Sequence, residues 1–153
     1  MESISLISKG SSVWEPFLQK RSPPLFPLTH RTIPLNLPYY YGHSGEQYAF
    51  FRIPKLLLTD DRFAELSTDA KLLYGLLLDR MELSYRNGWI DEQNRVFIIF
   101  TAEEVMDTLR CRSEKAARLF AELDSTKGIG LIERKRQGLG RPTLIYVKNF
   151  SGA

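Results

Sequence analysis

The sequence contains few of the residues that bind metals or form covalent cross-links. Cys111 is the only cysteine, which excludes an intramolecular disulfide, and with His30 and His43 as the only histidines a structural zinc site has too few ligands. The chain must therefore fold by packing alone. Its 153 residues, 43% of them hydrophobic, are enough to bury the core of one ordinary domain.

A long apolar run is also missing. No stretch approaches the roughly 20 residues that span a bilayer, and the first residues lack the basic-then-apolar order of a secretory signal. We therefore expect a cytoplasmic protein that does not contact a membrane. The net charge of +3 is only mildly basic, so the distribution of charge says more about a partner than its total does.

The sequence shows no arrangement typical of an active site. The adjacent carboxylates Asp60–Asp61 and Glu103–Glu104 suit a turn and a helix N-terminus rather than an acid–base pair. The tyrosines at 39–41 could supply a nucleophile for strand nicking, but that chemistry needs a metal whose ligands are missing. The glycine-rich segment 137–142 lacks the Gly-Lys-Ser/Thr ending of a nucleotide-binding P-loop. We expect no enzymatic activity and no cofactor.

Prolines divide the chain into regions. Six of the eight fall between Pro16 and Pro38, where each removes a backbone donor and disfavours helix at the preceding residue. We interpret residues 1–36 as a poorly ordered N-terminal arm, residues 37–150 as the folded domain and residues 151–153 as a tail. Deletion of such an arm should leave folding intact.

The first part of the domain predicts an extended segment followed by a long helix. Pro54 should interrupt regular pairing in residues 50–58, and a turn is expected at 59–61. Ser67 can cap the helix, and Asn87–Gly88 can end it. The apolar residues of this helix follow helical spacing on a broad face: Ala70, Leu72, Leu73, Tyr74, Leu76, Leu77, Met81, Leu83 and Tyr85.

The remaining elements complete the pattern of a winged helix. Residues 89–100 predict a hairpin around the turn Asp91–Asn94. Two helices follow in residues 101–125, the first with a capping box of Thr101 and Glu104 and the second capped by Ser113. Two strands joined by a glycine-rich loop end the domain. This order predicts an α+β fold, a winged helix-turn-helix with a three-helix core, a small antiparallel sheet and a wing hairpin.

The second helix of the pair separates into two faces. Ala116, Leu119, Phe120 and Leu123 recur at core spacing, which turns polar side chains outward near the helix start and along its exposed side. Recognition helices of this motif use such side chains to reach base edges in the major groove. A solvated surface helix would carry similar charges, so the helix alone does not decide. The candidate DNA contacts here are Arg112, Ser113, Lys115, Arg118 and Glu122.

The loop after this helix adds basic residues and glycines that favour contacts with phosphates. Its candidates are Arg134, Lys135, Arg136, Gly138, Gly140 and Arg141. Between residues 110 and 148 there are ten lysines or arginines against four acidic residues, an excess twice the net charge of the whole chain. Such clustering indicates a nucleic-acid partner.

Several long strings resemble the N-terminal domain of the plasmid replication initiator protein A family, in the same order and with the same spacing. They are FFRIPKLLLTDDRF, LSTDAKLLYGLLLDRMELSYRNGWID, VFIIFTAEEVM and GIGLIERKRQGLGRPTLIYVKNF, and the similarity runs from about Tyr39 to Phe150. The resemblance implies a winged helix that binds repeats in double-stranded DNA at a replication origin as a homodimer, without catalysis or cofactor. By position, residues 112–122 are then the recognition element and residues 136–143 the wing.

The two ends depart from the family. Residues 1–36 do not fit its pattern, and family members continue into a linker and a second domain, whereas this sequence stops at Ser151-Gly152-Ala153. Contact with host replication proteins is expected only through that second domain. A winged-helix transcription regulator bound to an operator would use the same helix and wing. A winged helix that binds another protein is a third possibility, and its binding affinity should hardly depend on salt.

Overall fold

The computed structural model describes residues 34–42 and 48–152. The fold lies in one compact unit, Phe51–Ala153, so the predicted domain boundary at residue 37 precedes the start of this unit. The described residues before it form no helix or strand, and their contacts include an edge-on pair of rings, Tyr40 and Tyr48, with centroids 6.3 Å apart. Most of the predicted arm, together with His30 and His43, lies outside the described residues.

The unit begins with helical turns where an extended segment was predicted. Helix α3 spans Leu56–Thr59 and the 3-10 helix η2 spans Asp61–Phe63. Pro54 lies just before α3, a position where the missing N–H and the fixed φ of proline are compatible with a first helical turn, and its carbonyl accepts from Leu57 N at 3.1 Å. The prediction of an extended chain through residue 58 is therefore wrong.

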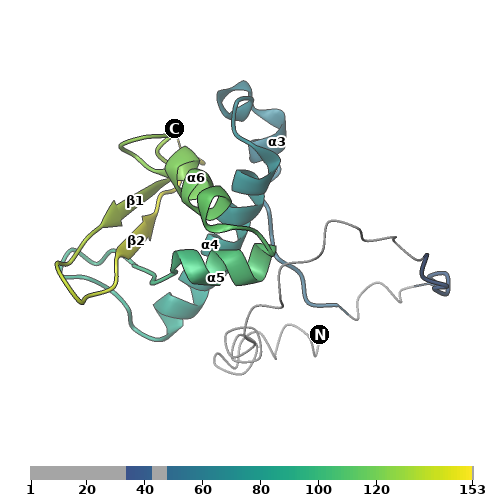
Figure 1. Ribbon diagram of the computed structural model, residues 1–153, viewed down its shortest axis with the longest axis horizontal. Coiled ribbons are helices and arrows are strands. Elements are labelled where there is room, and N and C mark those ends of the chain that lie inside the picture. The colour runs from purple at the N-terminus through teal and green to yellow at the C-terminus, as the bar shows by residue number, and fades with distance from the viewer. Residues whose placement is uncertain (1–33, 43–47, 153) are drawn as a thin grey trace. The chain divides into compact units, whose positions relative to one another are not determined.

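Helix α4, Thr68–Arg86, is the central helix of the unit. The predicted cap is confirmed, since Ser67 Oγ accepts a hydrogen bond from Ala70 N at 3.2 Å, and Gly88 follows the helix with a positive φ of 74°. Most of the predicted apolar face is buried, but Tyr85 in the last turn is exposed. Figure 1 shows α4 behind α5 and α6.

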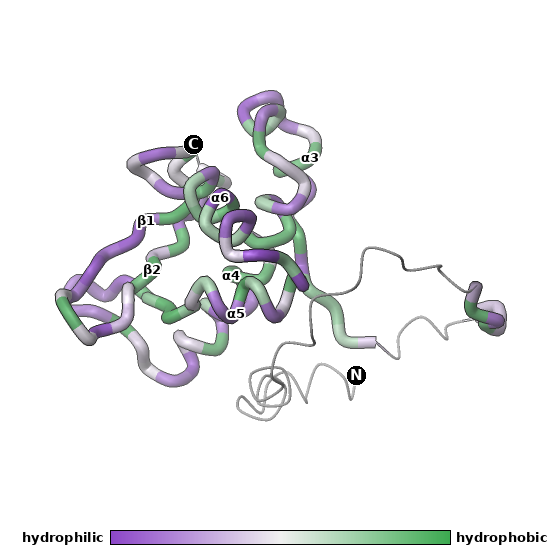
Figure 2. The backbone as a smooth tube through the Cα atoms, viewed as in Figure 1, coloured by the Kyte–Doolittle hydropathy of each residue, from purple (hydrophilic) through white to green (hydrophobic). Residues whose placement is uncertain are grey.

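The strands form a small antiparallel sheet. Strand β1, Ile132–Lys135, pairs with β2, Leu144–Val147, with Ile132 opposite Val147. On the tube of Figure 2, β1 is largely hydrophilic and β2 largely hydrophobic. The predicted hairpin after α4 is present as a bridge between Ile90 and Val96, and its second arm joins the sheet through Ile98 and Ile145.

The helix-turn-helix consists of α5, Ala102–Leu109, and α6, Ser113–Leu123. The capping box of Thr101 and Glu104 is confirmed. Arg110 ends α5 in the left-handed conformation, with φ 49°, so the turn is only three residues long and α6 starts directly after Arg112. The prediction that Ser113 caps α6 is therefore wrong, because Ser113 is the first residue of the helix.

One core joins these elements. The buried face of α6 packs with residues of α4, α5 and both strands, as the spacing predicted. The chain after β2 is also attached to the core, because Tyr74 Oη donates to Lys148 O at 2.8 Å and the ring of Phe150 lies 5.0 Å from that of Phe63. The architecture is that of a winged helix-turn-helix, with the loop between β1 and β2 as the wing (Figure 1).

Candidate nucleic-acid interface

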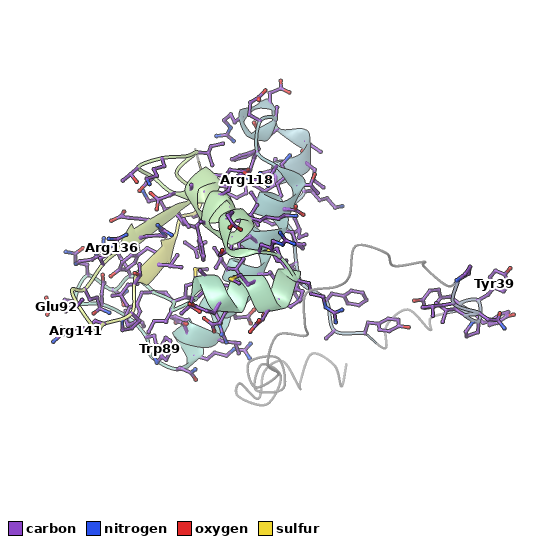
Figure 3. The ribbon with its side chains drawn as sticks, viewed as in Figure 1. Tyr39, Trp89, Glu92, Arg118, Arg136 and Arg141 are labelled. Atoms are coloured by element: carbon purple, nitrogen blue, oxygen red, sulfur yellow. The ribbon has the colours of Figure 1, made fainter. Side chains whose placement is uncertain are left out.

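Helix α6 presents an outward face next to its buried one. Ala116, Leu119, Phe120 and Leu123 are all buried, which fixes the rotation of the helix. Its first turn and opposite side are left to solvent, including Arg112, Ser113, Glu114, Ala117 and Arg118. Arg118 is the most open of the basic candidates that form ion pairs, with a side chain 68% exposed (Figure 3). The outward position predicted for Arg112, Ser113 and Arg118 is thus present.

Lys115 lies on the same helix but is paired with another element. Its Nζ contacts Oδ2 of Asp69 at 2.5 Å, and Asp69 lies in the first turn of α4. Both side chains remain nearly half exposed, so water screens the pair and the ammonium group stays accessible. A phosphate would have to compete with the Asp69 carboxylate for this lysine.

Glu122 is bound to the neighbouring helix cap. Its Oε2 accepts a hydrogen bond from Ser67 N at 3.0 Å, and its Oε1 lies 3.9 Å from Nε of Arg118. The Ser67 N–H is a donor at the start of α4 that the helix itself cannot satisfy. The position of Glu122 therefore serves the contact between α6 and α4, beside any part it has in binding DNA.

Arg134 is also engaged inside the protein. Its Nε donates to Oδ2 of Asp124 at 3.1 Å, and its guanidinium lies over the ring of Phe120, 5.3 Å from the centroid. Burial raises the pKa of Asp124, but hydrogen bonds from Thr126 and the charge and hydrogen bond of Arg134 outweigh it and hold this pKa below its ordinary value. Arg134 thus attaches β1 to the end of α6.

The wing carries the remaining basic candidates on exposed positions. Within the part of the chain that the structure describes, Lys135, Arg136 and Arg141 form no ion pair, and the same holds for Arg112. Gly138 and Gly140 have φ of 106° and 73°, values that only glycine adopts readily. Figure 3 shows Arg136 and Arg141 on the wing and Arg118 on α6.

The candidates therefore divide into two groups. Arg112, Lys135, Arg136 and Arg141 are exposed and form no ion pair within the described residues, and Arg118 is only weakly paired. Lys115, Glu122 and Arg134, in contrast, have partners that periodicity did not indicate. Sequence reasoning also missed Leu139, which lies fully exposed between the two wing glycines. The sequence could have indicated it, because Leu139 is an isolated large apolar residue in a basic, glycine-rich loop.

No group of three or more histidine, cysteine, aspartate or glutamate side chains among the described residues could hold a metal ion. No described helix combines the length and apolarity needed to cross a membrane.

Comparison with known families gives a direct assignment. The sequence model described as the N-terminus of replication initiator protein A matches residues 49–153. The chain belongs to this family. The match covers α3 through β2, and so includes both the helix-turn-helix and the wing.

Related proteins agree with this assignment. A "41 kDa protein" of Lactobacillus helveticus is 30% identical over 89 residues, which are 58% of this chain and 24% of that protein. The chain thus matches about a quarter of the length of this curated relative.

Solved structures share the fold. One described as "N-Terminal domain of DNA binding protein" has a TM-score of 0.60 and 30% identity, covering 74% of this chain and 84% of that one. A second, "Structure of Rep-DNA complex", has a TM-score of 0.60 and 30% identity, and covers 73% of this chain and 84% of that one. A third, "Structure of MDR initiator", has a TM-score of 0.57 and 28% identity, and covers 73% of this chain and 86% of that one.

Proposed function

We propose that this chain binds double-stranded DNA sequence-specifically at the repeats of a plasmid replication origin. The observation that carries the proposal is an exposed basic surface, on a fold that is similar to a protein solved in a Rep-DNA complex. Arg118 on α6 is only weakly paired. No ion pair within the described residues neutralises Arg112 or the wing residues Lys135, Arg136 and Arg141. Helix α6 would lie in the major groove, where arginine can pair with guanine. The wing would contact phosphates.

The proposed role is non-catalytic. The domain marks the origin through base and phosphate contacts and needs no cofactor. Repeats in an origin can be bound in pairs by a homodimer, whose two-fold symmetry would set the spacing of the half-sites. Recruitment of host replication proteins would belong to a second domain of an initiator.

Fluorescence-anisotropy titration tests the proposal. The chain is titrated with duplexes that carry the repeats nearest its own coding sequence and with scrambled duplexes, each at two salt concentrations. Specific origin binding predicts a preference for the repeats of about 10³-fold or more, with affinity that falls as salt rises. Equal affinity for both duplexes would contradict specific recognition, and binding that does not depend on salt would contradict phosphate contacts.

A further inference from the structure

The tip of the wing displays a single apolar side chain to solvent. Leu139 is fully exposed, whereas Ile132 and Ile145 of the strands that support the wing are buried. A lone exposed leucine is common on protein surfaces and has no meaning by itself. Two further features distinguish Leu139: the backbone around it directs its side chain outward, and the positive charges beside it indicate a negatively charged partner.

The backbone places Leu139 at the corner of a tight turn. Arg141 N donates to Gly138 O at 3.4 Å, which makes Leu139 and Gly140 the two central residues. Gly140, with φ 73°, has the positive value required at the third position of a type II turn. The leucine side chain therefore extends from the outside of the turn.

The loop below this turn is narrow and closed. Gln137 Nε2 donates to Pro142 O at 2.8 Å across its neck. A Cβ atom added at Gly138 or Gly140 would meet nothing within 4 Å, so both sides of Leu139 are open. The turn at the end of the wing thus presents one apolar side chain to solvent.

Positive charge flanks this tip. Arg136 precedes the turn and Arg141 is its last residue. Both are exposed, and neither forms an ion pair within the described residues. Figure 3 shows both arginines on the wing. An apolar residue between two cations fits the minor groove of a duplex, where phosphates line both edges and apolar side chains can enter a base step.

We propose that Leu139 enters the minor groove of the bound duplex as a wedge, while Arg136 and Arg141 contact the phosphates on either side. The inference rests on the proposed DNA binding and assigns the wing a task of its own. Partial unstacking of a base step bends the DNA, and flexible pyrimidine–purine steps accept such a bend at least cost. Part of the specificity then comes from how easily the DNA deforms.

The test measures bending and unstacking beside affinity. The origin-repeat duplex carries a donor and an acceptor dye at its ends for energy transfer, and a second version carries 2-aminopurine at successive adenines. Leu139→Ala shortens the wedge and leaves the backbone of the turn unchanged, Leu139→Met restores a long apolar side chain, and Leu58→Ala removes an exposed leucine of α3 as the matched control.

The expected result has three parts. Wild-type protein and Leu58→Ala shorten the end-to-end distance and raise 2-aminopurine fluorescence at one step. Leu139→Ala keeps its melting temperature, loses both signals and binds about tenfold more weakly, which corresponds to about 1.4 kcal/mol. Leu139→Met recovers most of the bend.

Two outcomes would overturn the wedge while leaving DNA binding intact. One is a Leu139→Ala variant that binds and bends the duplex as the wild type does. The other is a wild-type complex that binds the repeats without bending or unstacking them. Failure of the wild type to bind any duplex would instead refute the proposed function on which the wedge depends.

Discussion

The Oε2 of Glu122 accepts a hydrogen bond from the backbone N–H of Ser67 at 3.0 Å, which joins α6 to the start of α4. Ser67 is the N-cap of α4, so one residue of the proposed recognition helix satisfies a donor at the start of the central helix. The orientation of α6, and with it the direction of the candidate DNA contacts, depends in part on this bond.

Glu122→Ala should therefore lower stability more than it lowers DNA binding. A part-buried hydrogen bond with a charged group contributes about 1.5–3 kcal/mol, and we expect the free energy of unfolding to fall by about that amount in urea titrations. Glu114→Ala, an exposed glutamate of the same helix, is the control and should leave stability nearly unchanged. Weaker DNA binding at unchanged stability would show that Glu122 acts as a DNA contact instead.

Arg118→Ala should weaken DNA binding and leave the melting temperature nearly unchanged. The Arg118 side chain is 68% exposed and lies 3.9 Å from Glu122, so little stability depends on it. Loss of a base or phosphate contact should reduce affinity by about tenfold or more in anisotropy titrations. Arg86→Ala is the matched control, because Arg86 is an exposed arginine with an i,i+4 glutamate on α4. An Arg118→Ala variant that unfolds would refute the assigned rotation of α6.

Leu119→Asp should abolish cooperative folding. Leu119 is completely buried, so an aspartate at its position would place an unpaired carboxylate in the core. The free energy of unfolding of a typical domain is only ~5–15 kcal/mol, and burial of such a group would consume a large part of it. Ala117→Asp, two residues away on the exposed face, should keep the sharp thermal transition in circular dichroism. If both variants melt like the wild type, the buried face has been assigned to the wrong side of the helix.

The periodicity of α6 was sufficient to predict its two faces because burial follows the 3.6-residue repeat. The partners of Lys115 and Glu122 could not be predicted in this way, since they lie on α4 and the bond between Ser67 and Glu122 joins residues 55 positions apart. Spacing along one helix says which side faces inward, but not which charged group of another element is opposite.

Local rules failed where two of them competed. Pro54 suggested an interruption of extended chain, whereas it lies just before the helical turn α3. Ser113 suggested a cap, but the left-handed Arg110 shortens the turn so that Arg112 takes the capping position without a side-chain bond. In both places the path of the chain in space determined where the helix begins. The preference of a single residue does not predict that path.

Tyr74 should make the unfolding free energy depend on alkaline pH. Burial raises the pKa of Tyr74 to about 12, above the ordinary value of about 10 in an unfolded chain. The folded state therefore holds the phenolic proton more tightly, and its stability is fully present below pH ~10 and is lost as pH rises through ~12. Urea titrations of Tyr74→Phe should show a shallower decline in this window.

The same variant has a separate cost at neutral pH. Without the hydroxyl, Lys148 O loses its donor, which should lower stability by about 1 kcal/mol at pH 7. The curves for wild type and Tyr74→Phe should therefore approach each other between pH ~10 and ~12. Curves that stay parallel across the window would mean that Tyr74 does not titrate with folding.

Asp69→Asn should strengthen DNA binding by releasing Lys115. The carboxylate of Asp69 competes with phosphate for the ammonium group, and an exposed ion pair of this kind contributes ~0.2–1 kcal/mol. We expect affinity for the repeats to rise about two- to fivefold, with a steeper dependence on salt because one more cation meets the DNA. Asn can still accept hydrogen bonds near the start of α4, so the melting temperature should change little.

Glu82→Gln separates release of Lys115 from a general change in charge. It also removes one negative charge from α4 and breaks an exposed ion pair, with Arg86, but at the opposite end of the helix. If Asp69 acts through Lys115, anisotropy titrations should show the gain for Asp69→Asn alone, and Lys115→Ala should abolish it in the double variant. An equal gain for both single variants would mean that only net charge matters, and that Lys115 makes no contact with phosphate.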